Sequence, residues 1–305
     1  MHNNANPDMP VMSSTGSLGA KLREVPVLYA LEQLTSEPEV PGRLLVEVNA
    51  DAGTYHQGHV PTAITLDWLD DLQHPARLGF VDAGGFAALM DSRGITTETH
   101  VVLLGDSGNR YAALLYWYFS YYGHRRVSLL DGGRMAWLAA GLPLTDQVTD
   151  PTPTVGYHVQ DHRTDIRTNR DEILTRYVGA PAGTLLLDCR TPDEHHGEVT
   201  SQADLPIERH RVTGHIPGSR NLPSGTLVDE RTGRLHPAPV LRQLFTASGL
   251  EATSDVAVYC RVADRSALMW FALSEVLEHP QTRHYDGGWA EYGSLIDAPS
   301  VRSAI

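Results

Sequence analysis

Residues 256–266 read Val256-Ala257-Val258-Tyr259-Cys260-Arg261-Val262-Ala263-Asp264-Arg265-Ser266. The first four are β-branched, apolar or aromatic, and this composition predicts a short buried strand. From Ser266 onward, apolar residues recur with helical spacing at Ala267, Leu268, Trp270, Phe271 and Val276. The segment therefore predicts a strand, a loop that opens with Cys260 and a following helix, which together form a unit of a parallel α/β sheet.

The loop has the composition of an anion site built around a thiolate. Cys260 stands between the end of the strand and the start of the helix, and Arg261 and Arg265 flank it. A free cysteine titrates near pH 8.5, and such surroundings lower this value to roughly 3.5–7.5. Backbone N–H groups of such a loop form a concavity that binds anions. We expect Cys260 to be an ionised nucleophile, reachable from solvent, in an electropositive pocket.

The same pattern occurs twice in the chain. Both copies have an apolar strand, a loop that ends in an arginine and an Asp-Gly-Gly turn. The matching segments are Val101–Leu104 with Val256–Tyr259, Arg110 with Arg265, Asp131–Gly133 with Asp286–Gly288, Gly58–Pro61 with Gly214–Pro217, and Leu44–Glu47 with Leu185–Asp188. Extra residues in the second copy fall between Thr191 and Thr213. Matches in this order over so long a stretch indicate an internal duplication.

Each copy alternates strands with amphipathic helices, which predicts an α/β protein with two small parallel sheets flanked by helices. The predicted strands are Leu44–Val48, Val101–Leu104, Val127–Leu130, Leu185–Asp188, Val256–Tyr259 and Thr282–Tyr285. The predicted helices are Gly85–Ser92, Arg110–Tyr121, Pro239–Ser248 and Ser266–Glu278. We expect a disordered tail at residues 1–22, domains at 23–143 and 161–305, and an extended linker at 144–160, where Pro, Thr and Asp are frequent.

The two copies differ at the nucleophile. The position that matches Cys260 is Gly105 in the first copy, and Asp106 follows it. The first copy therefore has no thiol in this loop, and an acidic side chain there repels an anion. We expect the first domain to be catalytically silent and the second to be the catalytic one.

Composition excludes several classes of partner. The formal net charge is −13, which argues against nucleic acid and against an anionic membrane surface as partners. No stretch approaches the ~20 apolar residues of a membrane span. Two cysteines, Cys189 and Cys260, are too few for a disulfide framework and fit a reducing cytoplasm. The N-terminus lacks the charged-then-apolar pattern of a signal peptide, so we expect a cytoplasmic protein.

These motifs resemble those of the tandem-domain rhodaneses, the thiosulfate sulfurtransferase family, from about Val25 to Ala298. The resemblance rests on the two Gly-His-x-Pro turns, the two Asp-Gly-Gly turns, Trp289 and the loop from Tyr259 to Ser266. It implies two rhodanese-like domains with catalysis confined to the second. It also implies transfer of the outer sulfur of thiosulfate, by way of a persulfide on Cys260, to cyanide or a thiol acceptor, with no metal and no organic cofactor.

The resemblance assigns substrate binding to the loop. Arg261 and Arg265 would bind the anionic donor as charge-assisted hydrogen-bond donors, and N–H groups of the loop would hold the sulfur. The substrate-binding residues predicted in this way are Arg261, Val262, Ala263, Asp264, Arg265 and Ser266. Arg261 directly after the cysteine favours thiosulfate over 3-mercaptopyruvate, because the mercaptopyruvate enzymes tend to have a small residue there. Val262 departs from the many family members that carry a basic residue at that position.

Three alternative functions stay open. The first is a 3-mercaptopyruvate sulfurtransferase, and the second is a rhodanese-like module that binds without catalysis. The third is a phosphatase or an arsenate reductase with a cysteine loop, whose pattern is Cys, five residues and Arg. Here only four residues separate Cys260 from Arg265, and the shorter loop suits a single sulfur atom better than a phosphate.

Other polar residues near the predicted strand ends have structural interpretations. Cys189 is either a resolving thiol or, as we prefer, a buried core residue. Arg190 is a possible supporting cation of the site, with Asp188 as its partner. The histidines at 195, 196, 210 and 215 lack a metal-binding spacing, and we expect most of them in an exposed polar loop, with His215 as a turn residue that is mirrored by His59.

Overall fold

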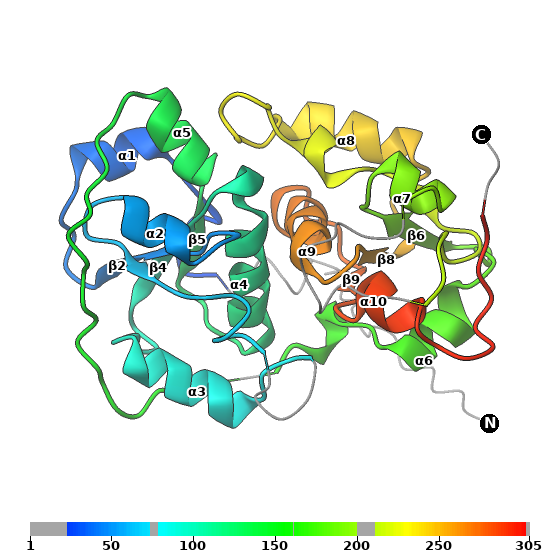
Figure 1. Cartoon of the computed structure of the whole chain (residues 1–305), viewed down its shortest axis with the longest axis horizontal. Coiled ribbons are helices and arrows are strands. Elements are labelled where there is room, and N and C mark those ends of the chain that lie inside the picture. Colours follow the sequence, from blue (N-terminus) through cyan, green and yellow to red (C-terminus); the bar gives the residue numbers. More distant parts are fainter. Residues whose placement is uncertain (1–22, 74–78, 161, 200–210, 303–305) are drawn as a thin grey trace, which may run out of the picture.

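The computed structural model describes residues 23–73, 79–160, 162–199 and 211–302. Two α/β units lie side by side, and we call residues 23–143 the first unit and residues 162–302 the second unit (Figure 1). The predicted tail at residues 1–22 lies outside the described residues, as does much of the insertion, residues 200–210. No helix in the described ranges has the length and apolar character that a bilayer crossing needs.

The first unit is built on a five-stranded sheet in which all neighbouring strands are parallel. The strands run in the order β1 (Leu28–Tyr29), β5 (Val127–Leu130), β4 (His100–Leu104), β2 (Arg43–Glu47) and β3 (Ile64–Thr65). Its helices are α1 (Leu31–Ser36), α2 (Gly53–Gln57), α3 (Ala83–Ser92), α4 (Arg110–Tyr121) and α5 (Gly133–Ala139).

The second unit repeats this plan on a four-stranded parallel sheet. The strands run in the order β7 (Arg220–Asn221), β6 (Thr184–Asp188), β8 (Asp255–Tyr259) and β9 (Thr282–His284). Its helices are α6 (Arg170–Glu172), α7 (Pro192–His196), α8 (Ala238–Ala247), α9 (Asp264–Trp270) and α10 (Gly288–Tyr292), with π-helical turns at Ile173–Tyr177 and Phe271–Val276. The order β7-β6-β8-β9 matches β3-β2-β4-β5, so the predicted fold class is confirmed.

The helix after the cysteine loop begins earlier than predicted. We expected it at Ser266, but α9 begins at Asp264. The preceding residue, Ala263, has φ 87° and ψ −31°, and this unusual backbone turns the chain into the helix two residues sooner. An acidic residue in the first helical turn also favours an early start, since it complements the positive end of the helix dipole. Asp264 and Arg265 are therefore helical residues.

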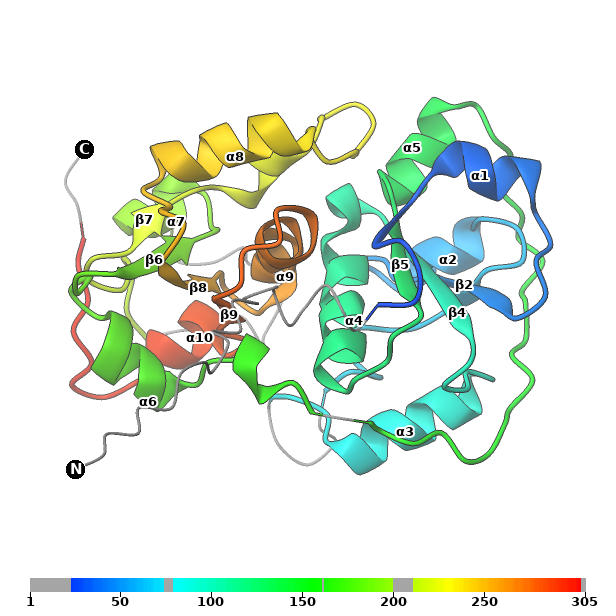
Figure 2. The same ribbon diagram turned by 180° about the vertical axis from the view of Figure 1, so that it is seen from behind.

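Two helices join the units. α4 and α9 pack against each other between the two sheets, as both views show (Figures 1 and 2). Nearly every residue of α4 is buried, as expected for a helix that is apolar all round. The Tyr116 ring meets Phe271 edge-on with 4.7 Å between centroids, and its hydroxyl donates to Glu275 Oε2 at 2.8 Å. One hydrophobic cluster therefore continues from the first sheet into the second unit.

The segment between the units contains no helix from residue 143 to residue 157. It is held against the first unit by Asp91 of α3, whose backbone oxygen accepts from Thr154 N at 2.8 Å and whose Oδ1 accepts from Tyr157 N at 2.9 Å. An extended chain without its own hydrogen-bonded structure needs such partners for its buried N–H groups.

Candidate active site

The two cysteines follow neighbouring strands. Cys260 comes directly after β8, and Cys189 comes directly after β6, its partner in the sheet. The backbone N–H of Cys189 donates to the Tyr259 oxygen at 2.8 Å, which extends the pairing to the point where the cysteines stand. Both thiols are free and buried. Because the carboxyl ends of parallel strands form the usual ligand edge of an α/β sheet, Cys260 stands where the sequence predicted it.

Cys260 is nevertheless more enclosed than expected. Its exposed fraction is 0%, and burial raises the pKa of its thiol, with the Asp264 carboxylate adding to the effect. The expectations of a solvent-reachable sulfur and a lowered pKa are therefore wrong for this structure. The physical reason is that the loop closes over the sulfur and brings a carboxylate to it: Cys260 Sγ lies 3.7 Å from Asp264 Oδ1.

Ser266 supplies the donors that oppose this effect. Its hydroxyl donates to Cys260 Sγ at 3.3 Å, and both the hydroxyl and the backbone N–H of Ser266 act to lower the pKa of the thiol. The hydroxyl also lies 2.8 Å from His284 Nε2. Burial lowers the pKa of His284 to about 4, so the imidazole is neutral at pH 7. Sequence reasoning missed His284, although it lies in the predicted strand Thr282–Tyr285; in the structure it ends β9, which pairs with the strand that precedes Cys260.

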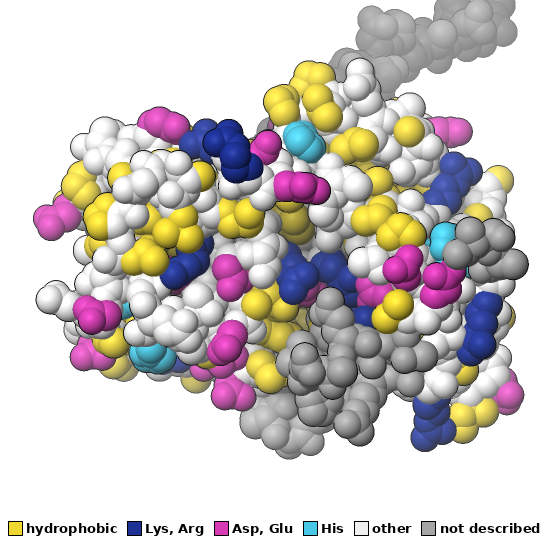
Figure 3. Space-filling model, turned by 45° about the horizontal axis from the view of Figure 1, so that its top comes forward, with side chains coloured by type: hydrophobic (Ala, Val, Ile, Leu, Met, Phe, Trp, Pro, Cys, Tyr) yellow, Lys and Arg dark blue, Asp and Glu magenta, His cyan; other side chains and the backbone are white. Residues whose placement is uncertain are grey.

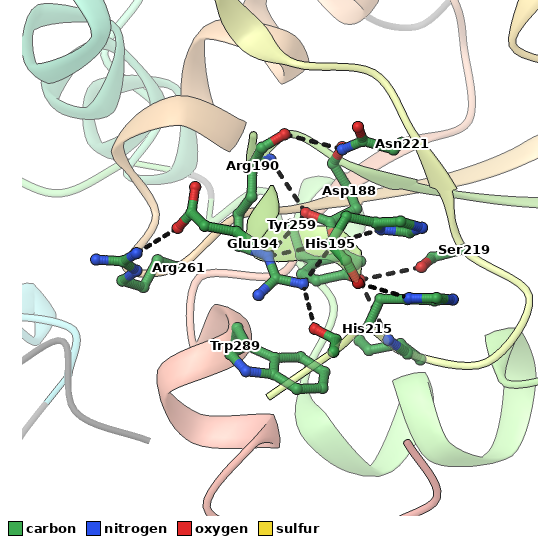
Figure 4. Close-up of polar contacts among 12 residues, drawn as sticks. Asp188, Arg190, Glu194, His195, His215, Ser219, Asn221, Tyr259, Arg261 and Trp289 are labelled. Carbon is green, nitrogen blue, oxygen red and sulfur yellow. Dashed lines mark hydrogen bonds and ion pairs between the residues drawn. The ribbon is translucent and has the colours of Figure 1, made fainter. Parts of the chain in front are cut away.

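The two loop arginines share one carboxylate. Arg265 Nη1 and Nη2 donate to the two oxygens of Glu194 at 2.6 and 3.1 Å, and Arg261 Nη2 donates to Glu194 Oε1 (Figure 4). Burial opposes ionisation of Glu194, but the hydrogen bonds and charge of Arg265, together with Arg261, outweigh it and lower the pKa of Glu194 to about 2. Two guanidinium groups therefore meet at one buried carboxylate.

The arginines differ in access. The Arg265 side chain is 14% exposed, and the Arg261 side chain is 2% exposed. On the face shown in Figure 3, basic side chains gather where the two halves of the molecule meet, beside acidic ones. The sequence prediction placed both arginines toward the substrate and missed Glu194. A signal was present, because Thr191 and Glu194 have the spacing of a capping box, which the structure forms at the start of α7.

The predicted Asp188–Arg190 ion pair is present. Arg190 Nε and Nη2 donate to Asp188 Oδ1 and Oδ2 at 2.9 and 2.6 Å. The same carboxylate accepts from the Tyr259 hydroxyl at 2.9 Å and lies 2.9 Å from His195 Nδ1 (Figure 4). Burial opposes ionisation of Asp188, but Arg190 and His195 lower its pKa below its usual range. This cluster fixes the ends of β6 and β8, which carry the two cysteines.

His195 corrects the prediction of an exposed polar loop. It is buried at the end of α7 and stacks on His215 with 3.7 Å between ring centroids. His215 Nδ1 also lies 2.8 Å from the His195 backbone oxygen. The first unit repeats this arrangement, since His59 stacks on Tyr55 at 3.7 Å and its Nδ1 lies 3.0 Å from the Tyr55 oxygen. The predicted turn role of His215 therefore agrees with its mirrored contacts.

Metal-ligating groups do not gather in the described part of the chain. No set of three or more His, Cys, Asp or Glu side chains among these residues is arranged to hold a metal ion. His210 lies outside the described residues.

The turn Asp286-Gly287-Gly288 packs against the backbone of the cysteine loop. Gly288 has φ 55°, and a Cβ there would lie 2.5 Å from the Arg261 oxygen and 2.8 Å from the Cys260 oxygen. Only glycine combines this conformation with so close an approach. The next residue, Trp289, donates its backbone N–H to the Cys260 oxygen at 2.8 Å. The turn therefore fixes the backbone of the nucleophile candidate.

A pocket of about 860 Å³ opens between the units beside the loop. Val262 and Ala263 form its border with the cysteine loop, while the first unit contributes an aromatic wall. The aromatic and charged lining residues include Trp68, Phe80, Tyr118, Tyr121, Tyr122, Arg167 and Asp286. Cys260 itself is not part of the pocket lining; Val262 and Ala263 are the residues of its loop that are.

Comparison with known proteins identifies the family. The rhodanese-like domain model matches residues 29–140 and 172–295, so each unit carries one match. A Mycolicibacterium smegmatis protein named "Putative thiosulfate sulfurtransferase" is 39% identical over 274 residues, which cover 90% of this chain and 96% of that protein. The Thermus thermophilus "Sulfur carrier protein TtuD" is 38% identical over 277 residues, with coverage of 90% and 96%.

Solved structures show the same fold. The structure of an anaerobic ergothioneine biosynthesis enzyme from Chlorobium limicola, in complex with trimethyl histidine, has a TM-score of 0.78 at 20% identity and covers 95% of this chain and 72% of that one. The structure of wild-type EanB has a TM-score of 0.77 at 21% identity, with coverage of 90% and 68%. At this identity the likeness concerns the fold alone. From the two domain matches and the relatives near 40% identity, the chain belongs to the rhodanese family of sulfurtransferases, with two rhodanese-like domains in tandem.

Proposed function

We propose that the protein transfers the sulfane sulfur of thiosulfate to an acceptor through a persulfide on Cys260. The observation that carries this proposal is the pair of donors on Ser266 that converge on the Cys260 sulfur at the carboxyl end of β8. Donors aimed at a sulfur stabilise the thiolate before reaction and the persulfide after it. The names of the relatives, thiosulfate sulfurtransferase and sulfur carrier protein, agree with this chemistry.

The reaction proceeds in two displacements. The Cys260 thiolate attacks the outer sulfur of thiosulfate, the S–S bond breaks, and sulfite leaves with the bonding electron pair. Cyanide or a thiolate then attacks the outer sulfur of the persulfide, which forms thiocyanate or a new persulfide and restores the Cys260 thiolate. Covalent catalysis of this kind divides one difficult transfer into two easier ones.

The loop residues have distinct roles in this proposal. Arg265, the more exposed of the two arginines, attracts the sulfonate end of thiosulfate with its guanidinium group. Arg261 is buried; through its ion pair with Glu194 it holds that carboxylate and the loop conformation in place. Backbone N–H groups from Val262 to Ser266 surround the transferred sulfur, and the Asp188–Arg190 pair supports the strand ends from the other side of the sheet.

The first unit is silent in this proposal. Gly105 stands where the second unit has Cys260, and its backbone N–H is occupied by Asn109 Oδ1 at 2.9 Å. The Asp106 carboxylate accepts from Ala50 N at 3.0 Å and stays in the loop, where it repels anions. The pocket wall is the part of the first unit that an acceptor would meet.

Mass spectrometry of the intact protein tests the proposal directly. Incubation with thiosulfate should add one sulfur atom, cyanide should remove it with release of thiocyanate, and Cys260→Ser should gain none. A wild-type protein that stays unmodified would contradict the enzymatic function and favour a binding module. Parallel assays with thiosulfate and 3-mercaptopyruvate, each with cyanide and with dithiothreitol, identify the donor and the class of acceptor. Faster hydrolysis of p-nitrophenyl phosphate than sulfur transfer would favour a phosphatase instead.

A further inference from the structure

An ion pair connects the first unit to the active loop. Arg110, the first residue of α4, places its Nε 3.0 Å from Oδ2 of Asp264, the first residue of α9. The Asp264 side chain is 5% exposed and that of Arg110 is 30% exposed. Arg110 is held in place by its neighbour, since its Nη2 donates to the Tyr111 hydroxyl at 3.1 Å and its guanidinium lies 4.9 Å from the centre of that ring.

The partner carboxylate faces the sulfur. Asp264 Oδ2 meets Arg110, and Asp264 Oδ1 lies 3.7 Å from Cys260 Sγ. A buried carboxylate at this distance repels a thiolate, and the repulsion grows in an environment of low dielectric constant. A cation that forms an ion pair with the far oxygen reduces the negative charge that the sulfur experiences.

The other groups around the sulfur do not replace this cation. Ser266 contributes neutral donors, with neutral His284 behind it. Cys189, after the adjacent strand, has a thiol whose pKa burial raises well above its usual value, so it is uncharged. Arg265 favours the thiolate, but both of its terminal nitrogens are engaged by Glu194. Arg110, by contrast, forms an ion pair with Asp264 itself.

The duplication explains where this cation comes from. Arg110 occupies the position in the first copy that Arg265 occupies in the second. The loop of the first copy has Gly105 in place of the cysteine but has the arginine. Packing of α4 on α9 brings the two helix starts together, so the arginine of the silent loop reaches the active one.

We infer that Arg110 of the first unit is a positioning residue for the reaction of the second: it holds the Asp264 carboxylate and offsets its charge beside the Cys260 sulfur. The inference rests on the proposed function in taking Cys260 as the reacting thiol. In this inference the first unit supplies Arg110 to the reaction of the second unit, in addition to lining the pocket.

The pH dependence of Cys260 alkylation tests this inference in the full-length protein. Cys260 modification by iodoacetamide is measured by peptide mass spectrometry from pH 5 to pH 10 in the wild type and in Arg110→Met, Arg110→Lys and Asp264→Asn. We expect Arg110→Met to shift the rate profile to higher pH, with a loss of roughly threefold to tenfold at pH 7. Arg110→Lys should keep most of the wild-type profile. Asp264→Asn should shift the profile to lower pH, and adding Arg110→Met to it should change little.

Glu32→Gln is the matched control. It breaks another ion pair between the units, Arg234 to Glu32 at 3.0 Å, without touching the loop. An equal shift in Glu32→Gln and Arg110→Met, or no shift in Arg110→Met, would overturn the inference. If Arg110→Met does not fold, the pH profile of Asp264→Asn tests the inference. An unchanged profile in that variant would show that the Asp264 carboxylate does not affect the Cys260 thiol, and the inference would be wrong. Sulfur loading from thiosulfate is scored separately: a wild type that titrates as expected but takes up no sulfur refutes the proposed function and leaves the ion-pair effect standing.

Discussion

The hydroxyl of Ser266 lies 3.3 Å from the sulfur of Cys260 and 2.8 Å from His284 Nε2. The serine therefore connects the nucleophile candidate to a buried, neutral imidazole. Together with the charge of Arg265, its hydrogen bond lowers the pKa of the thiol, against the effects of burial and of the nearby Asp264 carboxylate. The reactivity of Cys260 should depend on this hydroxyl.

Ser266→Ala should lower kcat/KM for thiosulfate by roughly tenfold or more, because a hydrogen bond to a charged group is worth about 1.5–3 kcal/mol. The loss should be larger at pH 7 than at pH 9, since the variant thiol needs a higher pH to ionise. Steady-state kinetics across pH measure this effect. Ser248→Ala, at the end of α8, is the control, and equal rates for Ser266→Ala and the wild type would show that the hydroxyl is not needed.

Arg265→Met should raise the KM for thiosulfate about tenfold with a smaller change in kcat, because it removes the more exposed cation of the Glu194 cluster.

Arg261→Gly should also raise this KM and shift the preference toward 3-mercaptopyruvate. Arg261 is buried against Glu194, so its loss should additionally lower the thermal midpoint. Donor competition assays and thermal unfolding separate the two effects. If Arg261→Gly keeps the wild-type preference between thiosulfate and 3-mercaptopyruvate, Arg261 does not determine donor specificity.

The folded protein should lose stability as the pH falls from 6.5 through 4. Burial lowers the pKa values of His284 and His124 to about 4, below the ~6.5 of an unfolded histidine. The unfolded chain binds more protons in this window, so the contribution is complete above pH 6.5 and is lost on acidification, by roughly 3 kcal/mol for each group. Urea unfolding at pH 4, 5.5 and 7 measures the slope. His284→Gln should flatten it, exposed His56→Gln should not, and a pH-independent midpoint would contradict the prediction.

Cys189→Ala should retain sulfur loading and turnover within about twofold of the wild type. Cys189 packs in the hydrophobic core with an exposed fraction of 1%, and burial raises the pKa of its thiol well above the usual value. A thiol of this kind is a poor nucleophile at neutral pH. Persulfide formation measured by mass spectrometry distinguishes the interpretations. A loss as complete as in Cys260→Ser would mean that the second cysteine takes part in the reaction.

Local patterns were enough to predict the architecture. Apolar runs between turn residues define buried parallel strands. For this reason the sequence locates five strands to within a residue or two, those predicted to begin at Leu44, Val101, Val127, Leu185 and Val256. The duplication supplied the repeated order of the sheets. The position of Cys260 at a strand end followed from the same pattern.

Contacts between distant elements were not predictable in the same way. The pairing of Arg261 and Arg265 with Glu194 depends on how α7 and α9 approach each other, and the sequence shows both arginines without their partner. Ala263, just before α9, has a positive φ, and the identity of an alanine does not predict this conformation. The electrostatics of the site was therefore harder to predict than its location.

The continuous core across α4 and α9 has a consequence for any attempt to separate the halves. If the two units were separated in the segment between residues 143 and 157, the apolar surfaces around Tyr116 and Phe271 would be exposed to water. In the whole protein these surfaces pack against each other. We expect calorimetry of the whole protein to record one cooperative melting transition, and each half expressed alone to aggregate. The core shared by α4 and α9 should therefore make the two units unfold together.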